Sequence, residues 1–156
     1  TEQPLFYEEF VVYASEKEKL LKKKYVLVND IDVNRLCLLE EGHCLRSQVF
    51  NLCELKNKER ELHQLDFATG SIETLKKIVE ASQGITILPF LALKDLSDKQ
   101  KKSVRHFKSP APVREIGLVT YRYFVKEKLI MRLKDEILKG IPEGMRRATK
   151  KVVVNI

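Results

Sequence analysis

The stretch from Ser71 to Pro89 constrains the fold more than any other part of the chain. Ser71 is a good helix N-cap, the apolar residues after it follow the spacing of one helical face, and Gly84 stands where helices commonly end. The four apolar or β-branched residues 85–88 follow at once and predict a buried strand, which Pro89 ends. A helix joined so closely to a buried strand predicts an α/β fold.

Other segments repeat this alternation. Aromatic and β-branched residues favour strands over Leu5–Tyr13 and Ile116–Phe124, and the run Leu36–Leu39 is typical of a buried strand that leaves the core at a turn. Helical periodicity covers His43–Leu55 and Val125–Lys139. Because the strands are continuous apolar runs, the pattern predicts an α/β architecture with a mostly parallel sheet.

Length and composition exclude several classes of protein. The 156 residues suffice for one domain with a real core, and a hydrophobic fraction of 44% is that of a globular chain. No stretch approaches the ~18 apolar residues of a membrane span, and residues 1–9 lack the layout of a signal peptide. Three cysteines are too few for a secreted disulfide scaffold. We therefore expect a cytoplasmic protein with no membrane partner.

The chain is basic, with 29 Lys and Arg against 22 Asp and Glu and a formal net charge of +7. Basic residues gather in Lys17–Lys24, Lys94–Lys108 and Arg146–Lys151, with Phe107 as the one aromatic residue among them. Nucleic-acid sites commonly combine basic and aromatic side chains. This distribution therefore favours a solvated surface over a nucleic-acid site.

One segment carries candidate chemistry. Cys44 lies between His43 and Leu45-Arg46, at the predicted start of a helix. Helix N-terminal amides and an adjacent cation stabilise a thiolate and lower a cysteine pKa from ~8.5 toward ~3.5–7.5. Peroxide oxidises a thiolate to sulfenic acid, which a second thiol converts to a disulfide. Cys53 is the obvious second thiol.

The spacing of these cysteines has a structural consequence. Residues nine apart on one helix are separated by about 13.5 Å of rise, whereas a disulfide tolerates at most about 7 Å between Cα atoms. If the segment is helical when reduced, oxidation requires the helix to be remodelled.

Two other interpretations stay open: Cys44 and Cys53 are inert packing residues, or they bind zinc with Cys37 and His43. No compact ligand spacing supports zinc, so we expect no metal, and Cys37 is read as a core residue.

The segment LCLLEEGHCLRSQVFNLC, Leu36–Cys53, resembles the redox-sensing segment of the OxyR family of LysR-type transcription regulators, with the same cysteine spacing. Ser71–Pro89 is similar to a helix-strand block of the same regulatory domain, and Val113–Arg122 to its return crossover strand. The resemblance implies a two-lobed domain of the periplasmic-binding-protein type 2 class, with a peroxide-reactive Cys44 and a resolving Cys53.

The resemblance also implies residue roles and a division of the chain. His43, Arg46 and Arg114 match positions that line or shape the peroxide pocket. Residues 1–14 would form a crossover strand from the first lobe, residues 15–113 the second lobe, and residues 114–156 the return strand and the C-terminal helix of the first lobe. Most of the first lobe and the DNA-reading helix-turn-helix would precede Thr1, so we expect an incomplete first lobe and DNA contact only through that other domain.

The leading hypothesis is therefore a hydrogen-peroxide-sensing regulatory domain of a transcription activator. It would act as a homodimer or homotetramer, need no cofactor, and be reset by a glutaredoxin-like thiol reductant; it would not be an enzyme. One alternative is a LysR-type domain that binds a small anion at the helix N-terminus carrying Ser71 and Thr74. A less favoured alternative is a thiol peroxidase, because the first chemical step would be the same.

Overall fold

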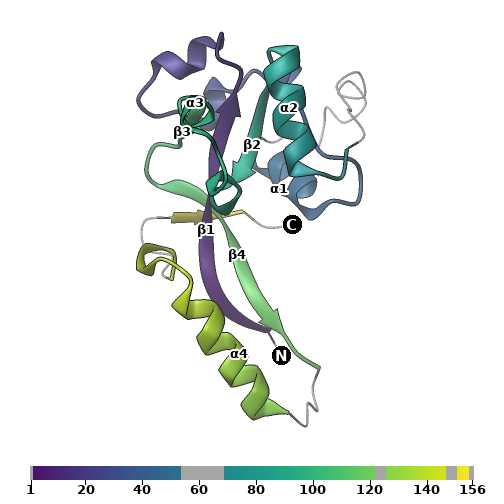
Figure 1. Cartoon of the computed structure of the whole chain (residues 1–156), viewed down its shortest axis with the longest axis vertical. Coiled ribbons are helices and arrows are strands. Elements are labelled where there is room, and N and C mark those ends of the chain that lie inside the picture. The colour runs from purple at the N-terminus through teal and green to yellow at the C-terminus, as the bar shows by residue number, and fades with distance from the viewer. Residues whose placement is uncertain (1, 54–68, 122–125, 147–150, 155–156) are drawn as a thin grey trace.

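The fold is organised around one long strand, β1 (Glu2–Ala14), which runs through both halves of the molecule (Figure 1). The computed structural model describes residues 2–53, 69–121, 126–146 and 151–154. Three strands pair with β1, all antiparallel: β2 (Ile85–Pro89), β3 (Val104–His106) and β4 (Ala111–Val119). β2 and β3 flank its second half, β4 flanks its first half, and β5 (Lys151–Val153) adds to β4 in parallel.

The mostly parallel sheet predicted from the sequence is therefore wrong for the described strands. The prediction used the unbroken apolar character of the strands, but residues 10–14 of β1 are all buried while both of their neighbours run antiparallel. Burial on both faces produces a continuous apolar run whatever the direction of the partner strands. An apolar run therefore indicates that a strand is buried, but not whether its neighbours run parallel or antiparallel to it.

Two further strand predictions need correction. Leu36–Leu39 is not a full strand; only Leu36 forms an isolated parallel bridge, with Ile85, and the Thr86 hydroxyl donates to the Cys37 carbonyl at 2.8 Å. The strand predicted over 116–124 instead occupies Ala111–Val119, with Pro112 inside it, and residues 122–124 lie outside the described part. The short strand β3 lies within the polar segment 94–108, which contains no apolar run.

The predicted helices are confirmed, apart from residues 54, 55 and 125, which lie outside the described part. They are α1 (Cys44–Leu52), α2 (Ile72–Ser82) and α4 (Glu127–Lys139). A four-residue helix, α3, covers Asp98–Lys101. Short 3-10 turns lie at Lys19–Lys22, Val28–Asp30, Val33–Arg35, Phe90–Leu93 and Glu143–Met145. Among the described helices, none is long and apolar enough to cross a membrane.

The ends of α2 follow the chemistry read from the sequence. The Ser71 hydroxyl accepts a hydrogen bond from the Thr74 amide at 3.4 Å, so Ser71 is the N-cap. Gln83 closes the helix in the left-handed conformation, at φ 56°. Gly84 follows, and a Cβ at this position would lie 2.6 Å from the Cys37 sulfur. A side chain at position 84 would therefore displace the segment that holds Cys37.

Two apolar clusters hold the fold together. The larger cluster packs α1 and α2 against β1 and β2, with Tyr13, Leu45, Leu75 and Ile87 at or below 2% exposure. The smaller cluster contains Leu5, Phe6 and Met145 as its buried members and lies under α4. Figure 1 shows α4 beside the first half of β1 and β4, away from α1 and α2.

A buried ion pair joins β1 to β4 between these clusters. Glu8 is 1% exposed and stands opposite Arg114 in the strand register. One Glu8 oxygen, Oε2, accepts from Arg114 Nε at 2.9 Å and lies 2.7 Å from Nη2. The other oxygen accepts from the Leu91 amide at 2.7 Å. Because both carboxylate oxygens are bound, the charge is compensated inside the fold.

Replacing Glu8 by Ala is expected to lower the free energy of unfolding by about 3 kcal/mol, since it leaves a largely buried guanidinium without its partner. Urea denaturation followed by circular dichroism measures this loss. Glu2→Ala, at an exposed position of the same strand, is the matched control and should change stability by less than about 0.5 kcal/mol. Equal effects of the two substitutions would contradict the role given to the ion pair.

Candidate redox site

Cys44 is the first residue of α1 and is exposed, as the predicted helix start requires. The turn before it contains Gly42 at φ 85°, a conformation that favours glycine. His43 is the N-cap, and its Nδ1 accepts a hydrogen bond from the Leu45 amide at 3.3 Å. The imidazole thus fixes the helix start and lies next to the thiol in sequence, which gives Cys44 a defined position with access to solvent.

Cys53 stands at the opposite end of the same helix. It is the C-cap of α1, and its amide donates to the Val49 carbonyl at 3.0 Å. Its side chain is half-buried, and this burial raises the pKa of the Cys53 thiol to about 11. Cys53 is therefore protonated at neutral pH and is a poor nucleophile while α1 is intact.

All three cysteines are free, and α1 separates Cys44 from Cys53 along its whole length. The helical rise puts their Cα atoms about 13 Å apart, roughly twice the reach of a disulfide. The site is thus in a reduced arrangement, and the two sulfurs cannot bond unless α1 unwinds.

The inner face of α1 is tied to the core. Leu45, Val49 and Phe50 are buried, and Arg46 is only 7% exposed. The Arg46 guanidinium donates to the Leu39 carbonyl at 2.8 Å and stacks on the Phe50 ring at 4.9 Å. One group opposes this stability: Gln48 Oε1 is buried without a hydrogen-bond partner among the described residues. A buried unsatisfied amide oxygen costs about 1–3 kcal/mol and favours opening of the helix.

The remaining candidate residues are distributed differently. His43, Cys44 and Arg46 come together in the first turn of α1, whereas Arg114 lies on β4 with its guanidinium bound by Glu8. Ser71 uses its hydroxyl to cap α2, and Thr74 is exposed one turn later. Among the described residues, no group of three or more His, Cys, Asp and Glu side chains is placed to hold a metal ion.

Cys37 occupies the core position expected for it. It is 2% exposed, and its sulfur lies 3.7 Å from the Ser82 hydroxyl. Burial raises the pKa of the Cys37 thiol, with a smaller opposing effect from Ser82. A neutral buried thiol of this kind is chemically inert.

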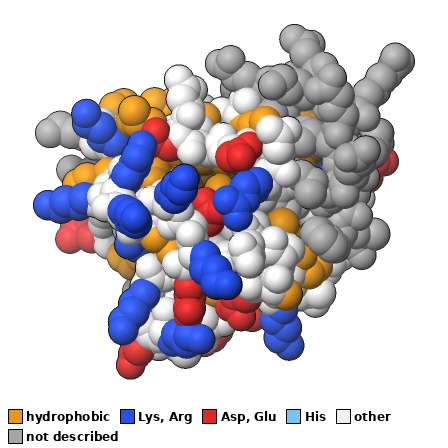
Figure 2. All heavy atoms as spheres, turned by 90° about the horizontal axis from the view of Figure 1, so that it is seen from above, with side chains coloured by type: hydrophobic (Ala, Val, Ile, Leu, Met, Phe, Trp, Pro, Cys, Tyr) orange, Lys and Arg blue, Asp and Glu red, His pale blue; other side chains and the backbone are white. Residues whose placement is uncertain are grey.

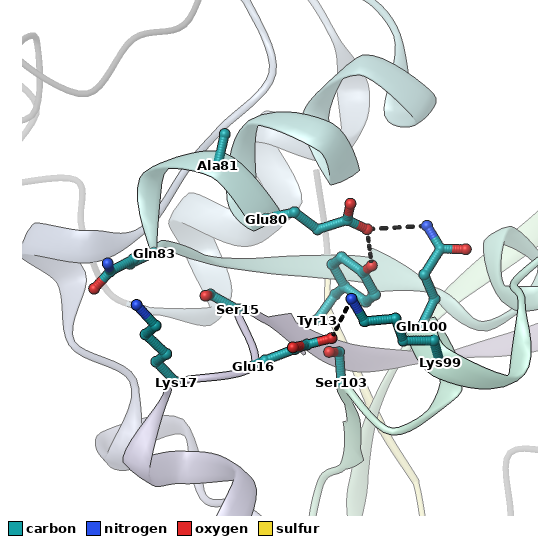
Figure 3. A pocket seen from close by; sticks show the side chains of 10 residues that line it. All are labelled: Tyr13, Ser15, Glu16, Lys17, Glu80, Ala81, Gln83, Lys99, Gln100 and Ser103. Carbon is teal, nitrogen blue, oxygen red and sulfur yellow. Dashed lines mark hydrogen bonds and ion pairs between the residues drawn. The ribbon is translucent and has the colours of Figure 1, made fainter.

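A polar cavity of about 340 Å³ was missed by the sequence analysis (Figure 3). Tyr13 and Glu80 both line it and lie in contact, and the Tyr13 hydroxyl donates to Glu80 Oε1 at 2.5 Å. Gln100 donates to the same oxygen at 2.9 Å, and Gln100 first and Tyr13 second lower the pKa of Glu80. Burial, followed by the bond to Glu80, raises the pKa of Tyr13. Separate segments supply these residues, so no local motif marks the cavity.

The sheet and the helix-strand block define a family of domains. The family model for the LysR substrate binding domain matches residues 1–138, and the chain belongs to this family.

Two curated relatives carry related names. The chain is 30% identical over 154 residues to the "Hydrogen peroxide-inducible genes activator" of Haemophilus influenzae, covering 93% of this chain and 48% of the relative. It is 34% identical over 120 residues to the "DNA-binding transcriptional dual regulator OxyR" of Escherichia coli K12, covering 76% of this chain and 38% of the relative. The chain thus spans half or less of the length of these relatives.

A solved structure of an OxyR protein also matches this chain. The crystal structure of reduced OxyR from Porphyromonas gingivalis superposes with a TM-score of 0.83 at 33% identity, covering 98% of this chain and 69% of that chain. The expected resemblance to OxyR and the expected periplasmic-binding-protein-like class are confirmed.

The burial of Cys53 predicts a pH-dependent reactivity. In the folded, reduced chain, alkylation of Cys53 by iodoacetamide should rise about tenfold per pH unit from pH 7 to 9, because only its thiolate reacts. Peptide mass spectrometry measures the rate at each cysteine. In urea at pH 7 the same thiol should react on the order of a hundredfold faster, as its pKa returns toward ~8.5. Equal rates in the folded and unfolded chain would show that burial does not protect Cys53.

Proposed function

We propose that this chain is the hydrogen-peroxide-sensing regulatory domain of a LysR-type transcription activator, switched by a disulfide between Cys44 and Cys53. The observation that carries the proposal is the placement of an exposed thiol at the start of α1 and a half-buried thiol at its end. The names of the relatives, hydrogen peroxide-inducible genes activator and OxyR, support the same conclusion.

Hydrogen peroxide is the only oxidant that disulfide formation between Cys44 and Cys53 needs. The Cys44 thiolate attacks one peroxide oxygen, the O–O bond breaks, and the second oxygen leaves as hydroxide, which takes up a proton to become water. The Cys53 sulfur then attacks the Cys44 sulfenic acid, and its oxygen leaves as a second water. Two thiols and one peroxide give one disulfide and two waters, so the chain loses two hydrogen atoms.

Neighbouring groups have separate proposed roles. Because Nδ1 of His43 accepts from the Leu45 amide, its second ring nitrogen would donate a hydrogen bond to the peroxide. Arg46 and Arg114 are proposed to shape the peroxide pocket and to stabilise negative charge near it. In the reduced form they bind the Leu39 carbonyl and Glu8.

The consequence of oxidation would be a rearrangement of the domain. Residues 1–14 and 114–156 are proposed to belong to the first lobe and its crossovers, and residues 15–113 to the second lobe; the two separate apolar clusters support this division. Remodelling of α1 would change how protomers of a homodimer or homotetramer pack, and DNA would be bound through a helix-turn-helix domain of the full-length regulator. A glutaredoxin-like reductant in the cytoplasm would restore the thiols.

Brief treatment of the reduced chain with near-stoichiometric hydrogen peroxide should remove two hydrogen masses, mapped by peptide mass spectrometry to a Cys44 to Cys53 linkage. Cys44→Ser should abolish the reaction, and Cys53→Ser should leave one added oxygen on Cys44. Cys37→Ser is the matched control and should oxidise normally. Unmodified thiols in a folded chain would overturn the proposal in favour of a solute-binding domain, whereas rapid turnover with an added thiol reductant would identify a peroxidase.

The same reaction should remove the hydrogen-exchange protection of the α1 amides from Gln48 to Leu52, because the disulfide cannot form while this helix persists. Exchange measured by mass spectrometry before and after peroxide tests this, with the amides of α2 as the internal reference. A disulfide that forms while α1 stays protected would rule out unwinding as the switch.

A further inference from the structure

The net charge of the chain is confined to two segments. Residues 15–24 and 94–108 together contain eleven Lys and Arg and four Asp and Glu, a net charge of +7, which equals the +7 of the whole chain. The rest of the chain is therefore balanced, with 18 residues of each sign. We call these two segments the basic end.

The fold brings the two segments together although about seventy residues separate them in sequence. The Ala14 amide, which precedes the first segment, donates to the Ser103 carbonyl at 3.0 Å. Arg105 donates from Nε to the Lys23 carbonyl at 2.9 Å, and Lys99 forms an ion pair with Glu16 at 3.1 Å. Figure 2 looks down on this end of the molecule and shows Lys and Arg side chains across the described part of its face.

Most of this charge is uncompensated. Every lysine of the basic end is exposed. Three of them have carboxylate partners: Lys23 with Asp30, Lys99 with Glu16 and Lys101 with Asp98. The others have no ion pair within the described ranges of the chain: Lys17, Lys19, Lys22, Lys24, Lys94, Lys102 and Lys108.

We propose that the basic end binds the phosphate backbone of double-stranded DNA without reading its sequence. This inference rests on the proposed function, because a DNA-binding regulator holds its sensing domain close to a duplex. A duplex carries one charge per about 1.7 Å, and a surface of unpaired lysines releases its condensed counterions. An acidic protein fits less well, since protein interfaces are poor in lysine, and the apolar side chains Leu20 and Leu96 are buried here.

DNA phosphates bound at the basic end would replace both expectations made from the sequence, a solvated surface and DNA contact only through another domain. The sequence shows several basic segments at a distance from one another. The pairing of β3 with β1 places the second of these segments beside the first. The one aromatic residue of the basic end, Phe107, is buried, which argues against stacking on bases, and phosphate contacts do not need stacking.

The test is fluorescence anisotropy of the reduced chain with a labelled duplex of arbitrary sequence, from low to physiological salt. The chain should bind at low salt. A variant with Lys19, Lys22 and Lys102 changed to Gln should bind at least tenfold more weakly, and the slope of log K against log salt should fall by about 2.7. The control carries Lys128→Gln, Lys134→Gln and Lys139→Gln on α4, which removes the same charge, and should bind within about twofold of the unchanged chain.

No binding at low salt, or equal losses in both variants, would overturn the proposal. Labelled polyglutamate is tested as a second probe. A variant that loses binding to polyglutamate but not to the duplex would also overturn the proposal and would identify an acidic protein as the partner. Both variants are also treated with peroxide. If the disulfide forms normally but DNA does not bind, only the proposed DNA-binding role of the basic end is wrong. If DNA binds but the disulfide does not form, the proposed peroxide sensor is wrong and the DNA-binding surface stands.

Discussion

The arrangement of every site in this domain depends on the pairing of β1. The strand is longer than any of its partners, so β4 pairs with its first half and β2 and β3 with its second half. This division creates the two apolar clusters and places the Glu8 ion pair between them. The buried end of β1 also leads directly into the polar cavity at Tyr13 and into the basic end.

Features that depend on neighbouring residues could be predicted from the sequence. The cap at Ser71, the helix end before Gly84 and the position of Cys44 in the first turn of α1 follow from side-chain chemistry within a few residues. Strand direction was predicted incorrectly because apolar runs measure burial only. The binding of Arg114 by Glu8 depends on a strand register across more than a hundred residues, which periodicity does not encode.

Helix α1 combines two opposing properties. Its buried side chains and the Arg46 hydrogen bond to Leu39 hold the reduced arrangement, whereas the Gln48 oxygen, which has no partner in the described part of the chain, weakens it. A sensor based on this helix needs such a balance, because a state that is too stable would not open after oxidation. The core around Cys37 does not share the weakness, since its neighbouring Thr86 and Ser82 satisfy the local polar groups.

The burial of Cys53 has a consequence for the order of events after Cys44 is oxidised. Burial raises the pKa of its thiol and lowers the thiolate fraction further, so intact α1 both holds this sulfur at a distance and suppresses its reactivity. Unwinding would expose the thiol, and its pKa would fall toward that of a free cysteine. One motion would therefore deliver the second thiol and activate it, and the opening rate of α1 would set the lifetime of the sulfenic acid on Cys44.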